Sequence, residues 1–149
     1  MIARAILAFV LFPLTVAFIV PLGLLRPPAS ERTFHFAALA PLIVGTVLLL
    51  WCVRDFYVSG KGTLAPWSPP RHLVVVGLYR WSRNPMYITV VVILLGWAAA
   101  YRSTTLLGYA AFFMFLFHVR VVFFEEPWLA RRYGERWEHY RAHVPRWFG

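Results

Sequence analysis

The chain is poor in cysteine and in charge, and each shortage excludes a class of protein. Cys52 is the only cysteine among 149 residues, which excludes an intramolecular disulfide and a cysteine-based metal site. Charged residues make up only 14% of the chain, whereas 60% of the residues are hydrophobic and the mean hydropathy is +0.64. This balance is far from that of a soluble globular domain, and it indicates a protein whose natural solvent is lipid.

Acidic residues are also scarce. Six Asp and Glu residues face fifteen Lys and Arg residues, so that the formal net charge is +9. The basic residues lie beside hydrophobic runs, and we therefore interpret them as determinants of membrane topology and as contacts for anionic lipid. We expect the bilayer as a partner and no nucleic acid.

The hydrophobic residues form four runs of the length needed to cross about 30 Å of hydrocarbon in a helix. We predict an all-α polytopic fold, a single membrane-embedded domain over residues 1–149 with a cytoplasmic, amphipathic, helical C-terminal tail. The first run continues into Leu25, Arg26 and Pro27 without a small-residue cleavage site, so we expect an uncleaved helix. The predicted transmembrane helices cover about 6–25, 34–53, 85–100 and 104–124.

Local signals refine these four helices. Pro13 and Pro21 interrupt the first, which is tolerated where neighbouring helices satisfy the freed carbonyl groups. Asn84 and Pro85 are favoured at the N-cap and at the first position of a helix, so the third helix is expected to begin there. Only residues 101–103 separate the third helix from the fourth, which predicts an antiparallel hairpin.

The distribution of basic residues predicts the orientation. Four crossings place both termini and the loop between the second and third helices on one side, and this side holds most of the arginines and Lys61. By the positive-inside rule that side is cytoplasmic. We expect a multi-pass protein of a bacterial inner membrane whose functional site faces the cytoplasm.

Two polar segments lie on the predicted cytoplasmic side, over residues 73–87 and 118–146. The first runs from Gly77 through Arg83 into the third helix. The second begins at His118 on the fourth helix and contains four of the six acidic residues, among arginines and aromatic residues. This composition suits a polar ligand with a flat ring.

These two segments resemble the signature of the isoprenylcysteine carboxyl methyltransferase and phospholipid N-methyltransferase family of integral membrane enzymes. The resemblance covers about residues 73–145 and includes His118 and Val144-Pro145. Asn84 stands where the eukaryotic prenylcysteine enzymes have histidine, and Trp137 stands where tyrosine is usual. The first motif is matched by Gly77, Tyr79, Arg83, Asn84, Pro85 and Tyr87, and the second by Glu125, Glu126, Leu129, Tyr133, Gly134, Trp137 and Tyr140.

The resemblance implies transfer of a methyl group from S-adenosylmethionine to a lipophilic acceptor in the membrane. A prenylcysteine-like carboxylate, a phospholipid amine and a similar small lipophilic molecule all remain open as acceptors. We expect catalytic roles for Arg83, Glu126 and His118. The residues expected to bind the cofactor are Tyr79, Arg83, Asn84, Pro85, Tyr87, His118, Glu125, Glu126 and Tyr140.

The side-chain chemistry is compatible with this function. Adjacent helical residues point about 100° apart, so Glu125 and Glu126 are expected to differ in role, one meeting the ammonium or ribose of the cofactor and the other an arginine. Arg83 precedes a helix N-terminus and is expected to bind a carboxylate or phosphate. Arg120 is interpreted as one half of an interhelical ion pair or as a side chain that extends to the membrane interface. Because the donated methyl group is already activated, no metal is expected, and His139 and His143 are interpreted as a polar helix face.

Two other classes of function remain. One is an NADPH-dependent membrane reductase of the sterol-reductase type, which also places an arginine, a proline and a tyrosine at the cytoplasmic face. The other is a non-catalytic membrane scaffold subunit, which would leave the clustered glutamate, arginine and histidine side chains unexplained. The oligomeric state stays open.

Overall fold

The computed structural model describes residues 10–24, 34–61 and 71–148, and side chains from residue 13 onward. Within these ranges all regular structure is helical, which confirms the all-α prediction. The first part of the predicted first helix, residues 6–9, and the polar turn after it lie outside the described residues. The elements in chain order are η1 (Val10–Ile19), α2 (Val20–Leu24), η3 (Phe36–Ala38), α3 (Leu39–Gly60), η4 (Gly77–Arg80), α4 (Pro85–Ala100), α5 (Thr104–Arg120), η5 (Val121–Glu125), α6 (Glu126–Tyr133) and α7 (Glu135–His143).

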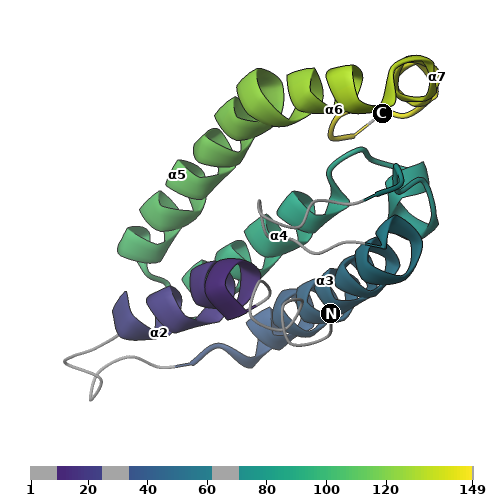
Figure 1. The fold of residues 1–149 in the computed structure, drawn as a ribbon. Helices are drawn as coiled ribbons and strands as arrows, with labels where there is room; N and C mark the ends of the chain where they lie inside the picture. Colours follow the sequence, from purple (N-terminus) through teal and green to yellow (C-terminus); the bar gives the residue numbers. More distant parts are fainter. Residues whose placement is uncertain (1–9, 25–33, 62–70, 149) are drawn as a thin grey trace.

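Helix α4 is the centre of the arrangement, because it packs against α3 and against α5. Figure 1 shows α5, η5 and α6 as one continuous helix that bends between α5 and α6, with α7 turning away at its end near the C-terminus. The buried core contains Leu49 of α3, Ile93 and Leu94 of α4, and Ala110 of α5. The N-terminal ends of α4 and α6 are thereby placed toward the same end of the molecule.

Helices α4 and α5 begin where the sequence predicts. Pro85 is the first residue of α4, and the Ser103 hydroxyl caps α5 by accepting a hydrogen bond from the backbone N–H of Leu106 at 3.3 Å. Helix α3 differs, because it continues to Gly60 instead of ending near Val53. Arg54 and Asp55 pair with each other at 3.1 Å, and Asp55 is buried, so these charges do not end the helix.

Among the described residues, two helices are long and apolar enough to cross a membrane, Phe36–Gly60 and Thr104–Tyr133. Only 28% and 22% of their most apolar windows are buried inside the protein. A core helix of a soluble protein would be mostly buried, so these surfaces are suited to contact with lipid. Pro13–Leu24 and Pro85–Ala100 are shorter apolar helices, and crossing by these two stays a prediction.

The proline-containing first helix is supported by its neighbours as expected. Pro21 has no N–H to donate to the carbonyl of Ala17, four residues earlier, or to that of Val16, its partner in π-helical spacing. Trp97 of α4 donates to the Ala17 carbonyl at 2.9 Å, and the Tyr109 hydroxyl of α5 donates to the Val16 carbonyl at 3.2 Å. These bonds also fix η1 against the hairpin of α4 and α5.

Two glycines let α3 and α4 approach closely. A Cβ on Gly45 would lie 2.7 Å from the Cγ1 atom of Ile93 and 3.3 Å from the carbonyl oxygen of Thr89. A Cβ on Gly96 would lie 3.0 Å from the side chain of Leu42. Small residues at such crossings allow the tight packing on which helix association in lipid depends.

Candidate functional site

Glu126 is the centre of an ion cluster where α4, α6 and the C-terminal tail meet. Its Oε1 atom lies 3.0 Å from Nη1 of Arg83. The guanidinium of Arg146 donates two hydrogen bonds to it, from Nε to Oε1 and from Nη2 to Oε2, each 2.8 Å long. Such a two-point contact fixes both the distance and the orientation of the carboxylate.

The Arg83 side chain is buried, and some of its N–H donors make no hydrogen bond to the described residues. Its side chain is 9% exposed, and its guanidinium lies 5.5 Å from the centre of the Trp137 ring, within the range of a cation–π contact. Its Nη1 contact with Glu126 lacks hydrogen-bond geometry. Within the described part of the chain, the Nε and Nη1 atoms of Arg83 therefore have no hydrogen-bond partner, nor does Nε1 of Trp137. Arg83 thus has two buried nitrogen donors that are not engaged in hydrogen bonds, next to the carboxylate of Glu126.

The electrostatics of the cluster favour an added anion. Arg83 and Arg146 carry two positive charges and Glu126 only one negative charge. Burial lowers the pKa of Arg83, although the charge of Glu126 opposes this shift. Hydrogen bonds to Glu126 raise the pKa of Arg146. A buried cation with unused donors gains most from a carboxylate or a phosphate.

The C-terminal tail is held to the start of α4 by backbone contacts. The N–H of Arg83 donates to the carbonyl of Pro145 at 2.9 Å. The Ser82 hydroxyl and the Asn84 side-chain amide both donate to the carbonyl of Arg146, at 3.2 and 3.1 Å. Asn84 is the N-cap residue of α4, as expected, but its side chain makes no capping bond, because its amide donates to the tail.

Glu125 belongs to a second cluster, between α4 and α5. Its Oε1 atom accepts a short hydrogen bond from the hydroxyl of Tyr87 and a 2.7 Å hydrogen bond from Nε of Arg120. Nε of Arg120 also lies 3.2 Å from the Tyr87 hydroxyl, and the ring of Tyr87 stacks on Phe117. The ion pair of Arg120 with Glu125 lies within the continuous helix Thr104–Tyr133, so the expected interhelical ion pair is wrong; Arg120 contacts α4 only through its hydrogen bond to Tyr87 among the described residues.

The two glutamates diverge as expected, but each of them meets an arginine. They lie at the junction of η5 and α6, where the helix passes from π-helical to α-helical spacing. The wider π-helical turn changes the direction of the following side chains, and such turns often occur at functional sites. Glu126 pairs with Arg83 and Arg146, and Glu125 pairs with Arg120; which of the two glutamates meets the cofactor stays a prediction.

His118 lies on α5 and is exposed to solvent. The indole N–H of Trp147 donates to Nδ1 of His118 at 3.3 Å, and the two rings are stacked. Arg146 and Trp147 therefore bring the tail into contact with Glu126 and with His118 from two successive positions.

Three of the residues that were expected to bind the cofactor, Tyr79, Tyr140 and Pro85, hold neighbouring elements together. The Tyr79 ring is buried beside Cys52 and Val74, and burial raises its pKa well above the usual value. The carbonyl of Tyr79 accepts a 2.6 Å hydrogen bond from the hydroxyl of Tyr140, whose pKa is also raised by burial. Pro85 is buried at the start of α4. These residues hold η4, α4 and α7 in position around the ion clusters.

Two hollows lie beside the clusters. A cavity of about 530 Å³ lies between α3 and η4. A groove of about 850 Å³ lies between residues 72–80 and α7, and it is rich in basic side chains. Arg80 lines both hollows, whereas Arg83 and Glu126 line neither. The groove is lined by His72, Leu73, Val75, Arg80, Glu135, Arg136, His139, Tyr140, His143 and Val144.

The structure also places near the site several residues that were not expected there. Arg146 and Trp147 follow Val144-Pro145, and no local pattern indicates their partners on α5 and α6. For Ser82, only its place within the first motif could have indicated a role at the site. Arg120 was expected only in an interhelical ion pair or at the membrane interface, yet it shares Glu125 with Tyr87.

Comparison with known proteins identifies a family for most of the chain. The family model described as phospholipid methyltransferase matches residues 33–136, which include α3, α4, α5, α6 and both glutamates. Comparison with curated proteins gives no match, and comparison with solved structures gives none either. The match ends before Arg146, so the tail that completes the ion cluster lies outside it.

Proposed function

Because the chain belongs to the phospholipid methyltransferase family, we propose that it methylates the amine of a phospholipid headgroup, with the cofactor held where α4, α6 and the C-terminal tail meet. Membership makes the protein an S-adenosylmethionine-dependent methyltransferase that acts on a lipid. The two long apolar helices agree with an integral membrane protein. The acceptor and the site residues are the proposal.

The observation that carries the site is the surplus of buried donors around Arg83. A bound carboxylate group would accept from Nε and Nη1 of Arg83 and would balance the extra positive charge of the cluster. The amino acid end of S-adenosylmethionine has such a carboxylate, so the residues present fit this group. Glu125, the last residue of η5, belongs to the neighbouring cluster, and it is the carboxylate available for the ammonium or the ribose of the cofactor.

The chemistry demands little beyond alignment and exclusion of water. When bound, S-adenosylmethionine supplies a methyl group on a sulfonium, and an amine that takes up this methyl group releases one proton while S-adenosylhomocysteine is left. Positioning alone lowers the barrier of such displacements by up to about 7–11 kcal/mol. Tyr87, Asn84 and Arg146 are suited to this task, because each is already oriented by a hydrogen bond.

The released proton needs an acceptor. Glu126 is a poor base, because two arginines hold its carboxylate. Glu125 is held by Tyr87 and by one arginine, and His118 is exposed with only Trp147 on its ring. We propose His118 as the proton acceptor, with Glu125 and Glu126 in binding roles.

We also propose that all four apolar helices cross the bilayer and that both termini are cytoplasmic. The ion clusters then lie at the cytoplasmic surface, where S-adenosylmethionine is available. Fusions of a cytoplasm-active and a periplasm-active reporter to the C-terminus and to residue 102 test this topology. Activity of the periplasmic reporter at the C-terminus would contradict it.

The experiment that tests the function is calorimetric titration of the detergent-purified protein with S-adenosylmethionine. Arg83→Gln and Glu126→Gln are expected to abolish binding, whereas Arg141→Gln, which alters an exposed arginine paired with Glu138, is expected to leave it unchanged. In parallel, the purified protein receives methyl-labelled S-adenosylmethionine and vesicles of phosphatidylethanolamine, phosphatidylglycerol or a prenylcysteine analogue. Label in the first lipid alone supports an amine acceptor.

Three outcomes would contradict the proposal. Label in the prenylcysteine analogue would identify a carboxylate acceptor. Binding that survives Arg83→Gln would place the cofactor elsewhere. Binding of NADPH in preference to S-adenosylmethionine would favour the reductase function.

A further inference from the structure

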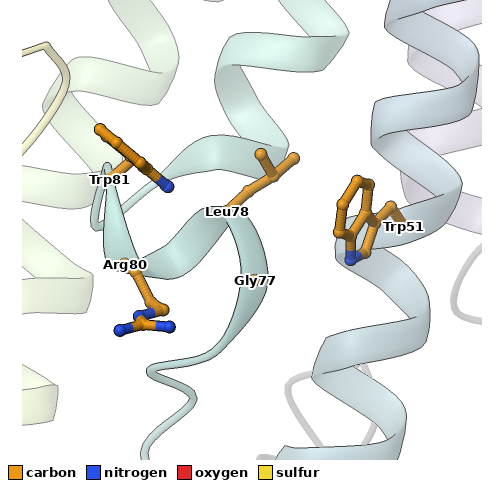
Figure 2. A pocket seen from close by; sticks show the side chains of 5 residues that line it. All are labelled: Trp51, Gly77, Leu78, Arg80 and Trp81. Atoms are coloured by element: carbon orange, nitrogen blue, oxygen red, sulfur yellow. The ribbon is translucent and has the colours of Figure 1, made fainter.

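The cavity between α3 and η4 is lined by two tryptophans and an arginine. It is lined by Trp51 of α3 and by Gly77, Leu78, Arg80 and Trp81. Figure 2 shows Trp51 facing the η4 turn, with Arg80 and Trp81 on opposite sides of that turn. Trp81 is 79% exposed and Trp51 is 47% exposed. Two open indole rings and one arginine thus surround a space of about 530 Å³.

A buried carboxylate lies directly behind this cavity. Asp55, the only aspartate of the chain, follows Trp51 by four residues on α3, so both point to the same side of the helix. Its Oδ1 atom meets Nη1 of the neighbouring Arg54, which is itself mostly exposed. Its Oδ2 atom is buried and has no hydrogen-bond partner among the residues that the structure describes. A buried charged oxygen without a donor is costly, and at membrane depth it marks a functional position.

Gly77 allows the Asp55 carboxylate to lie close to the wall of the cavity. The backbone of Gly77 has φ +55°, and a Cβ at this position would overlap Oδ2 of Asp55 and lie 3.2 Å from Nε1 of Trp51. Only glycine leaves room for the carboxylate against the turn that forms the cavity wall. Asp55 does not itself line the cavity, so a ligand must reach Oδ2 past the Trp51 ring, to which nothing among the described residues is hydrogen-bonded.

The charges around the cavity fit a ligand of mixed charge. Arg80 supplies a positive group, Asp55 a negative one, and the indole faces of Trp51 and Trp81 attract cations. A phosphodiester joined to an ammonium by a short linker offers the complementary pair. An anionic headgroup without an amine would satisfy Arg80 but leave Oδ2 of Asp55 unpaired.

We infer that this cavity is the recognition site for a zwitterionic lipid headgroup, in which Arg80 binds the phosphodiester and Asp55, with Trp51, binds the ammonium. This inference rests on the proposed phospholipid substrate and adds the residues that select it. The same η4 turn reaches the proposed cofactor site, because the carbonyl of Tyr79 accepts from Tyr140.

The inference is tested with short-chain lipids that dissolve as monomers. Dihexanoyl-phosphatidylethanolamine and dihexanoyl-phosphatidylglycerol are titrated into the detergent-purified protein and followed by calorimetry. We expect the first lipid to bind the unaltered protein more tightly than the second. Asp55→Asn keeps the shape of the side chain and removes its charge, and it should weaken binding of the ethanolamine lipid at least about tenfold, since charge-assisted contacts are the strong ones.

Further variants separate the two ends of the headgroup. Arg80→Gln should weaken binding of both lipids, because both have a phosphodiester. Trp51→Phe should retain most of the affinity and Trp51→Leu should lose it, since only the first keeps an aromatic face. Arg71→Gln, an exposed arginine of the same loop that does not line the cavity, is the matched control and should change neither affinity.

The two proposals can fail separately. Unchanged affinity for the ethanolamine lipid in Asp55→Asn, or equal affinity of the unaltered protein for both lipids, would overturn the headgroup site. Titration with S-adenosylmethionine on the same samples tests the cofactor site, and Asp55→Asn should leave that binding unchanged. If Asp55→Asn lowered the unfolding temperature and abolished S-adenosylmethionine binding together, its role would be structural, and the inference would be overturned.

Discussion

Arg146 and Glu126 form a two-point ion pair, 2.8 Å at each contact, that attaches the end of the chain to the first residue of α6. The same carboxylate meets Arg83 at the start of α4. One acidic side chain therefore joins three segments that are far apart in the sequence, and it determines the shape of the proposed cofactor site.

Glu126→Gln should be strongly destabilising. The change removes the only negative charge between Arg83 and Arg146 and leaves two cations facing each other. Breaking a buried ion pair by removing one partner costs about 3–5 kcal/mol. Thermal unfolding in detergent should therefore begin at a lower temperature than for the unaltered protein, and Glu138→Gln, in an exposed pair with Arg141, should have almost no effect. Equal unfolding temperatures for the two variants would refute the central role of Glu126.

Tyr87→Phe should weaken the binding of S-adenosylmethionine. The change removes the hydroxyl that donates to Glu125 and meets Arg120, but it keeps the stacking on Phe117. Loss of one such hydrogen bond costs about 1 kcal/mol. Affinity for S-adenosylmethionine should fall a few-fold, as measured by calorimetry. Tyr101→Phe, at the opposite end of α4, is the matched control, and an equal loss in both would argue against a role for Tyr87 at the site.

Alkaline pH should unfold the protein through Tyr140 and Tyr79. Burial raises the pKa of both hydroxyls above the value of about 10 that they have in an unfolded chain. The folded state then holds these protons more tightly, so its stability is complete below about pH 10 and falls as the pH rises toward the folded-state pKa, by up to about 1.4 kcal/mol per pH unit for each tyrosine.

The variant Tyr140→Phe checks the origin of this dependence. It removes one of the titrating groups, so its unfolding temperature should fall less steeply between about pH 10 and 11.5, although it starts lower because the bond to the Tyr79 carbonyl is lost. Parallel curves for the variant and the unaltered protein would exclude Tyr140 as a source of the pH dependence.

Local patterns in the sequence predicted the helices well and the contacts between them only in part. Asn84-Pro85 and the short turn before Ser103 locate the ends of α4 and α5, because these signals act within a few residues. Asp55 led to a wrong end for the second predicted helix, since a charge inside an apolar run normally marks a helix end. The burial of Asp55 behind Gly77 depends on a loop that is distant in the sequence.

The same limit applies to the site. Arg83, Tyr87, Glu125 and Glu126 were expected at the site and do lie in two adjacent clusters. The arginine partner of Glu126 from the tail was not foreseen, because no local pattern relates Arg146 to α6. Tertiary contacts between charged groups depend on how the helices pack, and hydropathy does not encode this packing.

Gly45→Ala should destabilise the protein, whereas the same change at Gly108 should not. The new methyl group at Gly45 would overlap Cγ1 of Ile93 and crowd the backbone of α4, and overpacking of this kind costs about 1–3 kcal/mol. At Gly108, on α5, nothing lies within 4 Å of an added Cβ, so alanine should be neutral or stabilise by up to about 1 kcal/mol through its helix propensity. Thermal unfolding in detergent compares the two, and a loss at Gly108 as large as at Gly45 would contradict the close approach of α3 and α4.

His118→Gln should lower the rate of methyl transfer while leaving S-adenosylmethionine affinity nearly unchanged. General base catalysis contributes typically about 10²–10⁴-fold, so kcat should fall at least about a hundredfold if His118 accepts the proton of the amine. Nδ1 of His118 already accepts from Trp147, so the tail must release the ring before this nitrogen can take a proton. Trp147→Phe removes the indole N–H but keeps an aromatic ring, and it should raise or preserve kcat where His118→Gln lowers it. An unchanged kcat in His118→Gln would transfer the role of proton acceptor to Glu125, the carboxylate of the neighbouring cluster.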